Sequence, residues 1–245
     1  MDLKKYKLNK KTKVLIVAAG EGKRANLEYP KTLYKINNIP ILIRILKKIS
    51  YIDSCPTIIV SRNGKDAISK CIHKYNFKAE LIIQNKPKGM GNAILRYGKS
   101  KFYRKYKNIL LIWGDLPFIY KNTLKQLVNS YFLKKSFLTI VTGINNNPYT
   151  LILRDSNLNI CKILESRNKN INAHTGERDI GIFLFNIKLL YYLNKFRHYD
   201  FIDNKKEHNF LYIINILYKK NLKISSSKIS NKKEFISFNS LQDLK

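Results

Sequence analysis

Cysteine is scarce in this sequence of 245 residues. The three cysteines, Cys55, Cys71 and Cys161, are far apart and form neither a CxxC pair nor a Cys/His spacing typical of zinc ligands. Because a disulfide framework needs paired cysteines and a structural zinc site needs closely spaced ligands, neither is expected here. We expect three ordinary thiols, buried or half-buried.

Long apolar runs are also missing. No run approaches the ~18 residues that a membrane-spanning helix needs. The first residues, MDLKKYKLNKKTK, are polar and basic and lack the apolar stretch of a signal peptide. Apolar residues still make up 44% of the chain and aromatic residues 12%, which is typical of a folded globule. We therefore expect a folded cytoplasmic protein that is not attached to a membrane.

Acidic residues are few: 16 stand against 47 lysines and arginines, which gives a net charge of +31. Such a charge can indicate a nucleic-acid partner. It can also follow from an A- and T-rich gene, since lysine, asparagine, isoleucine, tyrosine and phenylalanine are abundant together and arginine is rare. The lysines are spread along the whole chain, so we favour base composition and do not expect nucleic acid as a partner. The positive field would still attract anionic substrates such as nucleotides.

The first part of the chain alternates between apolar extended runs and helical patterns. This alternation predicts a Rossmann-like, doubly wound α/β sheet. The predicted strands are residues 14–19, 57–61, 79–83, 108–113 and 137–142, and the predicted helices are residues 41–50, 66–75, 91–106 and 122–134.

The pattern changes after residue 142. Residues 149–154 and 160–165 are extended runs joined by the turn-rich segment DSNLN, which predicts a hairpin. A further strand is predicted at 180–185 and an exposed loop at 168–177. The remaining predictions are helices at 188–194 and 210–219, short strands at 222–225 and 235–238, and a last helix that begins at SLQDLK. We expect one domain, residues 1–245, with halves at 1–142 and 143–245.

Glycines follow the first predicted strand in the stretch VLIVAAGEGKRANLEYPKTL. Gly20 and Gly22 would let backbone amides approach phosphate oxygens at the carboxyl end of that strand. Arg24 and Lys31 could supply positive charge to the same phosphates. Two common nucleotide motifs are absent, because Asn26 stands near the place of the third glycine of GxGxxG and no GK[ST] follows. An oxidoreductase that binds a dinucleotide is accordingly disfavoured.

Four stretches in this order resemble the motifs of the sugar-phosphate nucleotidyltransferase family. That family has a G-x-G-T-R-M loop followed by P-K, a Q-x(4)-G-T-G-x-A base segment, an L-x-G-D-x-P-x-I strand end, and a closing segment with a metal-binding asparagine or aspartate. The corresponding stretches here are LIVAAGEGKRANLEYPKTL, QNKPKGMGNA, LLIWGDLPFI and EFISFNSLQDL. Within the family, the chain is most similar to the uridylyltransferase half of the bifunctional N-acetylglucosamine-1-phosphate enzymes. Their acetyltransferase half has no counterpart in this sequence.

The resemblance implies a nucleotide-diphospho-sugar transferase fold, a Mg²⁺ cofactor and a set of roles on the phosphate side. Asp115 and Asn239 would hold the metal, Arg24 would hold the departing pyrophosphate, and Lys31 would bridge the α-phosphate and the sugar phosphate. A carboxylate and an amide oxygen suit Mg²⁺, which prefers hard oxygen ligands. The nucleotide would be bound by Ala19, Gly20, Gly22, Gln84, Gly89, Met90 and Gly91.

On the sugar side the resemblance implies Glu165, Asp179 and Thr150. Asp179 stands where the family has asparagine, and Thr150 where the nearest relatives have glycine. Lys23 and Met90 replace two threonines of the family pattern. Residues 1–142 would then be the nucleotide-binding half and residues 143–245 the sugar-binding half.

The implied reaction joins a nucleoside triphosphate to a sugar 1-phosphate and releases pyrophosphate. UTP and N-acetylglucosamine 1-phosphate are the favoured substrates, and acetyl transfer would need a separate partner. A cytidylyl-, thymidylyl- or guanylyltransferase of the same fold remains an alternative. So does a basic nucleic-acid-binding protein that has kept the fold without activity. The chain could also form a homo-oligomer.

Overall fold

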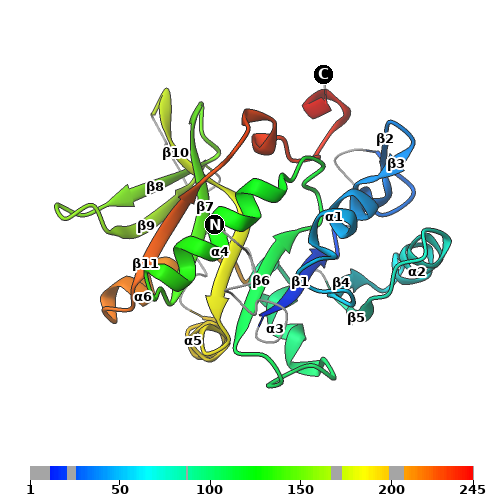
Figure 1. Cartoon of the computed structure of the whole chain (residues 1–245), viewed down its shortest axis with the longest axis horizontal. Helices are drawn as coiled ribbons and strands as arrows, with labels where there is room; N and C mark the ends of the chain where they lie inside the picture. Colours follow the sequence, from blue (N-terminus) through cyan, green and yellow to red (C-terminus); the bar gives the residue numbers. More distant parts are fainter. Residues whose placement is uncertain (1–11, 21–25, 87, 167–172, 199–206, 245) are drawn as a thin grey trace.

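The computed structural model describes residues 12–20, 26–86, 88–166, 173–198 and 207–244 (Figure 1). Its centre is a seven-stranded sheet with the strand order β11-β7-β10-β6-β1-β4-β5. Strand β10 runs antiparallel to both of its neighbours, and the other pairs are parallel. The strands are β1 (Thr12–Ala18), β4 (Thr57–Ser61), β5 (Glu80–Gln84), β6 (Asn108–Trp113), β7 (Leu138–Asn146), β10 (Thr175–Asn186) and β11 (Ile224–Lys228). The predicted doubly wound mixed α/β sheet is confirmed.

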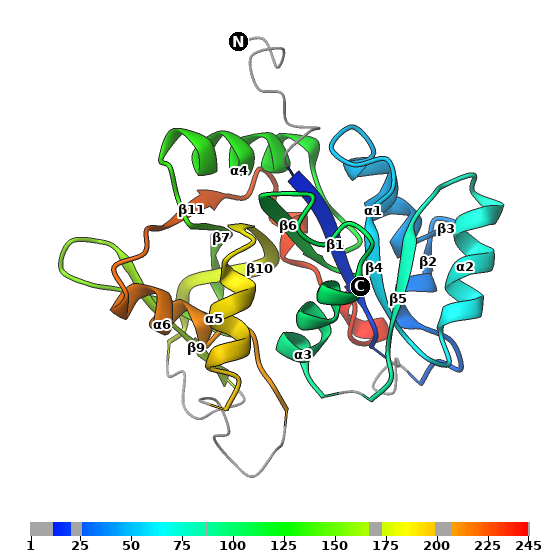
Figure 2. The same ribbon diagram turned by 90° about the horizontal axis from the view of Figure 1, so that it is seen from below.

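Helices cover both faces of this sheet, because its central strands are apolar on both sides. In β1, Val14 and Ile16 face one buried cluster while Leu15 and Val17 face the other. The first cluster is closed by α1 (Ile41–Ile49), α2 (Lys65–Lys74) and α4 (Lys121–Leu133), and the second by α3 (Met90–Leu95), α5 (Leu189–Lys195) and α6 (Ile213–Lys219). Figure 2 shows α1 and α4 on one side of the sheet and α3 and α5 on the other.

The predicted hairpin is present as β8 (Thr150–Arg154) and β9 (Ile160–Glu165), which pair antiparallel to each other. Strand β8 packs against β10, and β9 packs against α6. Strand β10 begins at Thr175, so the end of the loop predicted at 168–177 is strand instead. Residues 168–172 of that loop lie outside the described part. A short pair of strands, β2 (Lys35–Ile36) and β3 (Ile39–Pro40), was not predicted.

The helix predicted at 91–106 is much shorter. Helix α3 ends at Leu95 and a 3₁₀ turn continues to Lys99. At Ser100 the backbone becomes extended. The Ser100 hydroxyl donates to Glu80 Oε2 at 2.5 Å and accepts from the amide of Phe102 at 3.0 Å. The local bond between Phe102 and Ser100 competes with helical bonding, and the bond to Glu80 fixes Ser100 against β5, so the helix does not continue.

The strand predicted at 235–238 is also wrong. Asn231 and Glu234 form a capping box that starts a 3₁₀ turn, η7 (Lys232–Phe235), and the chain after it is irregular. The predicted last helix is a second 3₁₀ turn, η8 (Leu241–Leu244). In Figure 1 this C-terminal segment, coloured red, lies at the end of the molecule toward which β6 runs.

No helix among the described residues is both long and apolar enough to cross a membrane. The three cysteines are free and half-buried. The second observation agrees with the ordinary thiols expected from the sequence.

Candidate active site

A small pocket of about 70 Å³ lies at the carboxyl ends of β1 and β6. In parallel α/β sheets, ligands bind at this end of the strands. Gly114 lets the two strands approach closely there: its amide donates to the carbonyl of Val17 at 2.8 Å, and a Cβ on Gly114 would lie 2.8 Å from that oxygen. The pocket is lined by Val17, Ala18, Gly20, Lys31, Thr32, Met90, Trp113, Gly114 and Asp115.

Three residues that are far apart in the sequence meet in this pocket. The Lys31 ammonium donates to Asp115 Oδ2 at 2.5 Å and lies 3.4 Å from Asn239 Oδ1. Lys31 opens the 3₁₀ turn η4 (Lys31–Leu33), Asp115 follows β6, and Asn239 comes from the C-terminal segment. The structure thus brings together three of the predicted site residues. One of them is a cation, and the other two present side-chain oxygens to it.

The amide of Asn239 is held in one orientation. Its Nδ2 donates to Ser237 Oγ at 3.2 Å, which turns Oδ1 toward Lys31. The backbone amide of Asn239 donates to Asp243 Oδ2 at 2.7 Å. The preceding residue, Phe238, is fully buried, stacks on Tyr34 with ring centroids 4.4 Å apart, and donates its amide to the carbonyl of Asp115 at 2.8 Å.

These residues fit a divalent metal ion. Asp115 Oδ1 is buried and has no hydrogen-bond partner among the described residues, although burial of an unpartnered carboxylate oxygen is costly. The Lys31 ammonium already sits between the Asp115 and Asn239 oxygens, so their geometry suits a cation. Among the described residues, no group of three or more His, Cys, Asp or Glu side chains is arranged to hold a metal ion. Mg²⁺ does not need one, since it usually takes one or two carboxylates and completes its shell with water and substrate phosphates.

The predicted nucleotide residues lie beside this pocket as far as they are described. Ala19 is buried directly after β1, and a Cβ on Gly20 would lie 3.1 Å from Lys31 Cε. Gly22 and Arg24 belong to residues 21–25, outside the described part. Their placement in the site stays a prediction.

The predicted base segment forms a tight turn at the start of α3. Gly89 has φ +87°, and a Cβ there would lie 2.5 Å from the carbonyl oxygen of His208. The amide of Gly91 donates to that carbonyl at 2.8 Å. Gln84 is buried and its Nε2 donates to Gly89 O at 3.2 Å and Asn92 Oδ1 at 3.0 Å. Both donors of the Gln84 amide are therefore used within the protein.

His208 was not predicted, yet it closes this turn from the other half of the chain. Burial, with Arg197 and His198 nearby, lowers the pKa of His208 to about 4, so its ring is neutral at pH 7. The Tyr212 hydroxyl donates to the carbonyl of Leu193 at 3.0 Å, and His208 Nε2 lies 3.0 Å from the same hydroxyl. This arrangement suits the tautomer of His208 that carries its proton on Nε2.

The predicted sugar residues are engaged with other groups of the protein. Thr150 Oγ1 donates to Asp179 Oδ1 at 2.6 Å, and the amide of Gly181 donates to Asp179 Oδ2 at 2.9 Å. Asp179 is 2% exposed, and burial raises the pKa of its carboxyl group. Glu165 accepts a hydrogen bond from Asn209 Nδ2.

Trp113 is another pocket residue that the motifs did not single out. Its ring packs on Gly181, which has φ +80°, and a Cβ on Gly181 would lie 2.6 Å from the indole. This contact connects the pocket to the strand that carries Asp179. The only sequence signal was indirect: Trp113 is the chain's single tryptophan and stands two residues before Asp115.

Residues 14–168 match the MobA-like NTP transferase domain family. The chain belongs to this family. Its relatives include the bifunctional protein GlmU of Caldicellulosiruptor saccharolyticus, 29% identical over 97% of this chain and 51% of that protein. GlmU of Buchnera aphidicola subsp. Schizaphis graminum is 30% identical over 95% of this chain and 49% of that protein. The chain thus spans about half the length of these relatives.

Solved structures of nucleotidyltransferases share the fold of this family member. The inositol-1-phosphate CTP transferase of T. maritima superposes with a TM-score of 0.72 at 14% identity, over 96% of this chain and 92% of that one. A UDP-glucose pyrophosphorylase complexed with UDP-glucose gives 0.73 at 16% identity, over 91% and 92%. The chain is a nucleotidyltransferase of the sugar-phosphate family, as its motifs predicted.

Proposed function

We propose that this domain transfers a nucleotidyl group from UTP to N-acetylglucosamine 1-phosphate and releases pyrophosphate. The observation that carries the proposal is the meeting of Lys31, Asp115 and Asn239 in one pocket at the carboxyl ends of β1 and β6. The similarity to GlmU proteins over nearly the whole chain supports the choice of substrates.

In this reaction a phosphate oxygen of the sugar phosphate attacks the α-phosphorus of the triphosphate. The new bond joins that oxygen to the α-phosphorus, and the bond from the α-phosphorus to the bridging oxygen of pyrophosphate breaks. Both reactants are anions, so the protein must hold them together and offset their charge. Lys31 would leave Asp115 and contact phosphate oxygens of both reactants, and Arg24 would hold the pyrophosphate.

Asp115 and Asn239 would hold Mg²⁺. When bound, the ion supplies positive charge near the reacting phosphates. The partnerless Oδ1 of Asp115 and the oriented Oδ1 of Asn239 support this assignment.

The base would lie against the turn of Gly89, Met90 and Gly91. Since both donors of Gln84 are used within the protein, only its carbonyl oxygen is left to the ligand. An acceptor there can take the N3–H group of uracil or thymine, and also the N1–H group of guanine or the amino group of cytosine. The Gln84 contact therefore does not rank the bases, and dTTP, CTP and GTP stay the alternatives to UTP.

Glu165, Asp179 and Thr150 would line the sugar side, although each is already bonded within the protein. Residues 1–142 would bind the nucleotide and residues 143–245 the sugar. Acetyl transfer would lie outside this domain, and we expect the reaction to take place in the cytoplasm.

The test is a matrix of reactions. The pure protein is incubated with Mg²⁺, each of UTP, dTTP, CTP, GTP and ATP, and each of several sugar 1-phosphates, and pyrophosphate release is measured. We expect the fastest release with UTP and N-acetylglucosamine 1-phosphate. No release with any pair would contradict the proposal. Release that is fastest with another pair would keep the reaction type and change the substrates.

A further inference from the structure

One buried carboxylate outside the pocket has no role in the proposed reaction. Glu234 is 2% exposed and lies in the C-terminal segment, five residues before Asn239. A buried carboxylate is costly unless several donors satisfy it. Its contacts therefore show what it holds together.

Glu234 accepts hydrogen bonds from two separate parts of the chain. From the start of α4, Tyr120 donates its amide to Oε1 at 3.1 Å and Thr123 donates its hydroxyl to Oε2 at 2.6 Å. From its own segment, the amides of Ser230 and Asn231 donate to Oε2 at 2.9 and 3.2 Å. The carboxylate thus fastens the C-terminal segment to the first turn of α4, where the positive end of the helix dipole also favours a negative charge.

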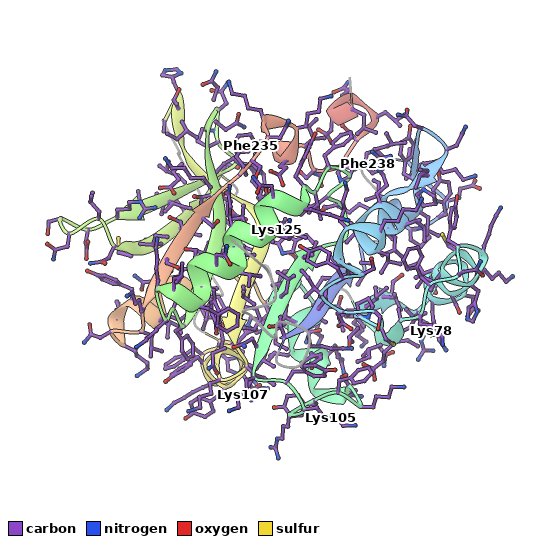
Figure 3. The ribbon with its side chains drawn as sticks, in the orientation of Figure 1. Lys78, Lys105, Lys107, Lys125, Phe235 and Phe238 are labelled. Carbon is purple, nitrogen blue, oxygen red and sulfur yellow. The ribbon has the colours of Figure 1, made fainter. Side chains whose placement is uncertain are left out.

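Both proposed metal ligands are tied to this carboxylate by short pieces of chain. Asp115 precedes Tyr120 by five residues, and Asn239 follows Glu234 by five residues. These two short segments are in contact at both ends. At one end Tyr120 of the first segment donates its amide to Glu234 of the second, and at the other end Phe238 donates its amide to the Asp115 carbonyl. At that second end the Lys31 ammonium lies between the side chains of Asp115 and Asn239. Figure 3 shows Phe235 and Phe238, which belong to the segment between Glu234 and Asn239, at one end of the molecule. Lys105 and Lys107 lie at the opposite end.

The two ligands depend on Glu234 to different degrees. Asp115 is placed by the sheet, because Gly114 before it is bonded to Val17 of β1. Asn239 lies in an irregular segment with no strand or α-helix of its own to position it. Loss of the Glu234 contacts should therefore displace Asn239 more than Asp115.

We propose that Glu234 is a positioning residue that sets Asn239 at the distance from Asp115 that a divalent cation requires. The inference rests on the proposed metal site and adds to it a residue that touches neither the metal nor the substrate. Partners outside the ligand shell commonly change metal affinity ten- to a hundredfold when removed, so we expect about a tenfold effect.

The test measures cation binding without nucleotide or turnover. Tb³⁺ prefers hard oxygen ligands, as Mg²⁺ does. The single tryptophan, Trp113, lies in the same pocket and can sensitise Tb³⁺ luminescence. All variants carry Lys31→Met, so that the ammonium does not compete for the Asp115 and Asn239 oxygens. Asp115→Asn in this background identifies the site-specific signal, which it should abolish.

A double-mutant cycle then separates positioning from general stability. Glu234→Ala should weaken Tb³⁺ binding about tenfold when Asn239 is present and by less than about twofold in an Asn239→Ala background. Thermal unfolding is measured for every variant, and any stability loss should be equal in both backgrounds. If the Glu234→Ala protein does not fold, the same double-mutant cycle is measured with Glu234→Gln, which keeps the shape of the side chain.

Equal losses of Tb³⁺ affinity in the two backgrounds would overturn the role of Glu234 and leave the metal site intact. An unchanged affinity after Glu234→Ala or Glu234→Gln would do the same. Failure of Tb³⁺ to bind the Lys31→Met protein, or binding that survives Asp115→Asn, would overturn the metal site itself and the inference with it.

Discussion

The proposed phosphate end of the pocket (Lys31, Asp115 and Asn239) and the proposed sugar side (Thr150 and Asp179) satisfy their polar groups in different ways. At the phosphate end, Lys31, Asp115 and Asn239 face one another, and Asp115 Oδ1 has no partner among the described residues. On the sugar side, both oxygens of Asp179 accept hydrogen bonds from Thr150 and Gly181. One region thus leaves a buried acceptor without a protein donor, while in the other both carboxylate oxygens already accept a bond from the protein. A residue at a family position can therefore contribute hydrogen bonds to the fold itself.

The largest effect is expected at the phosphate end. Lys31→Ala or Asp115→Ala should lower turnover by at least about a hundredfold. Lys31 supplies positive charge that offsets the repulsion of the two anions, and Asp115 would hold the metal ion that supplies more of it. Pyrophosphate release under saturating substrates measures turnover. Lys35→Ala, at an exposed position nearby, is the matched control and should leave turnover unchanged. Near-normal turnover in the Lys31 or the Asp115 variant would contradict the proposed role of that residue at the phosphate end.

A stability effect should mark the sugar side. Thr150→Val keeps the shape of the side chain but leaves Asp179 Oδ1, which is buried, without its donor. We expect a loss of about 1–3 kcal/mol in the free energy of unfolding, measured with urea. Thr175→Val, whose hydroxyl bonds an exposed asparagine, should cost less than about 0.5 kcal/mol. If Thr150→Val were as harmless as its control, the bond from Thr150 to Asp179 would contribute little to the stability of this region.

The junction of the two regions should respond to pH through His208. The pKa of this side chain is about 4 in the folded protein, below the ordinary value of 6.5. Between these values the unfolded chain binds the proton and the folded chain does not, so stability falls as the pH drops from 6.5 to 4. The contribution of one such group is at most about 1.4 kcal/mol per pH unit.

His208→Gln should remove this part of the pH dependence, seen by comparing urea unfolding at neutral and mildly acidic pH. His73→Gln, at an exposed position of α2, is the control and should keep the wild-type slope. An unchanged slope in His208→Gln would mean that the ring is protonated as easily in the folded protein as in the unfolded chain.

The smallest effect is expected at the outer edge of the sugar side. Arg154 donates to both oxygens of Glu177, at 2.9 and 2.8 Å, but both side chains are partly exposed. Arg154→Ala should therefore cost only about 0.2–1 kcal/mol of unfolding free energy, as surface ion pairs usually do, and less at high salt. A loss larger than that of Thr150→Val would show that the edge, and not the buried Asp179, stabilises this region.

Much of the fold followed from local patterns in the sequence. The apolar runs of β1, β4 and β6 and the amphipathic α1 and α4 were predicted close to their observed bounds, because each is long enough to show its own period. The predictions at 91–106 and 235–238 failed, because Glu80 and the capping box at Glu234 act through contacts that no period reveals. The motifs likewise named Lys31, Asp115 and Asn239 but gave no reason for Trp113, His208 or Glu234.

The sequence alone determined the class of the fold, the family and the residue types of the pocket, since these are set by runs of side chains and by motifs along the chain. Only the tertiary structure decided which donors and acceptors of those residues the protein itself uses. Thr150 donates to Asp179 and Asn209 donates to Glu165 across long stretches of sequence, while the Gln84 amide donates to the nearby Gly89 carbonyl and Asn92. A side chain has a fixed number of donors and acceptors, and folding determines how many of them the protein itself uses.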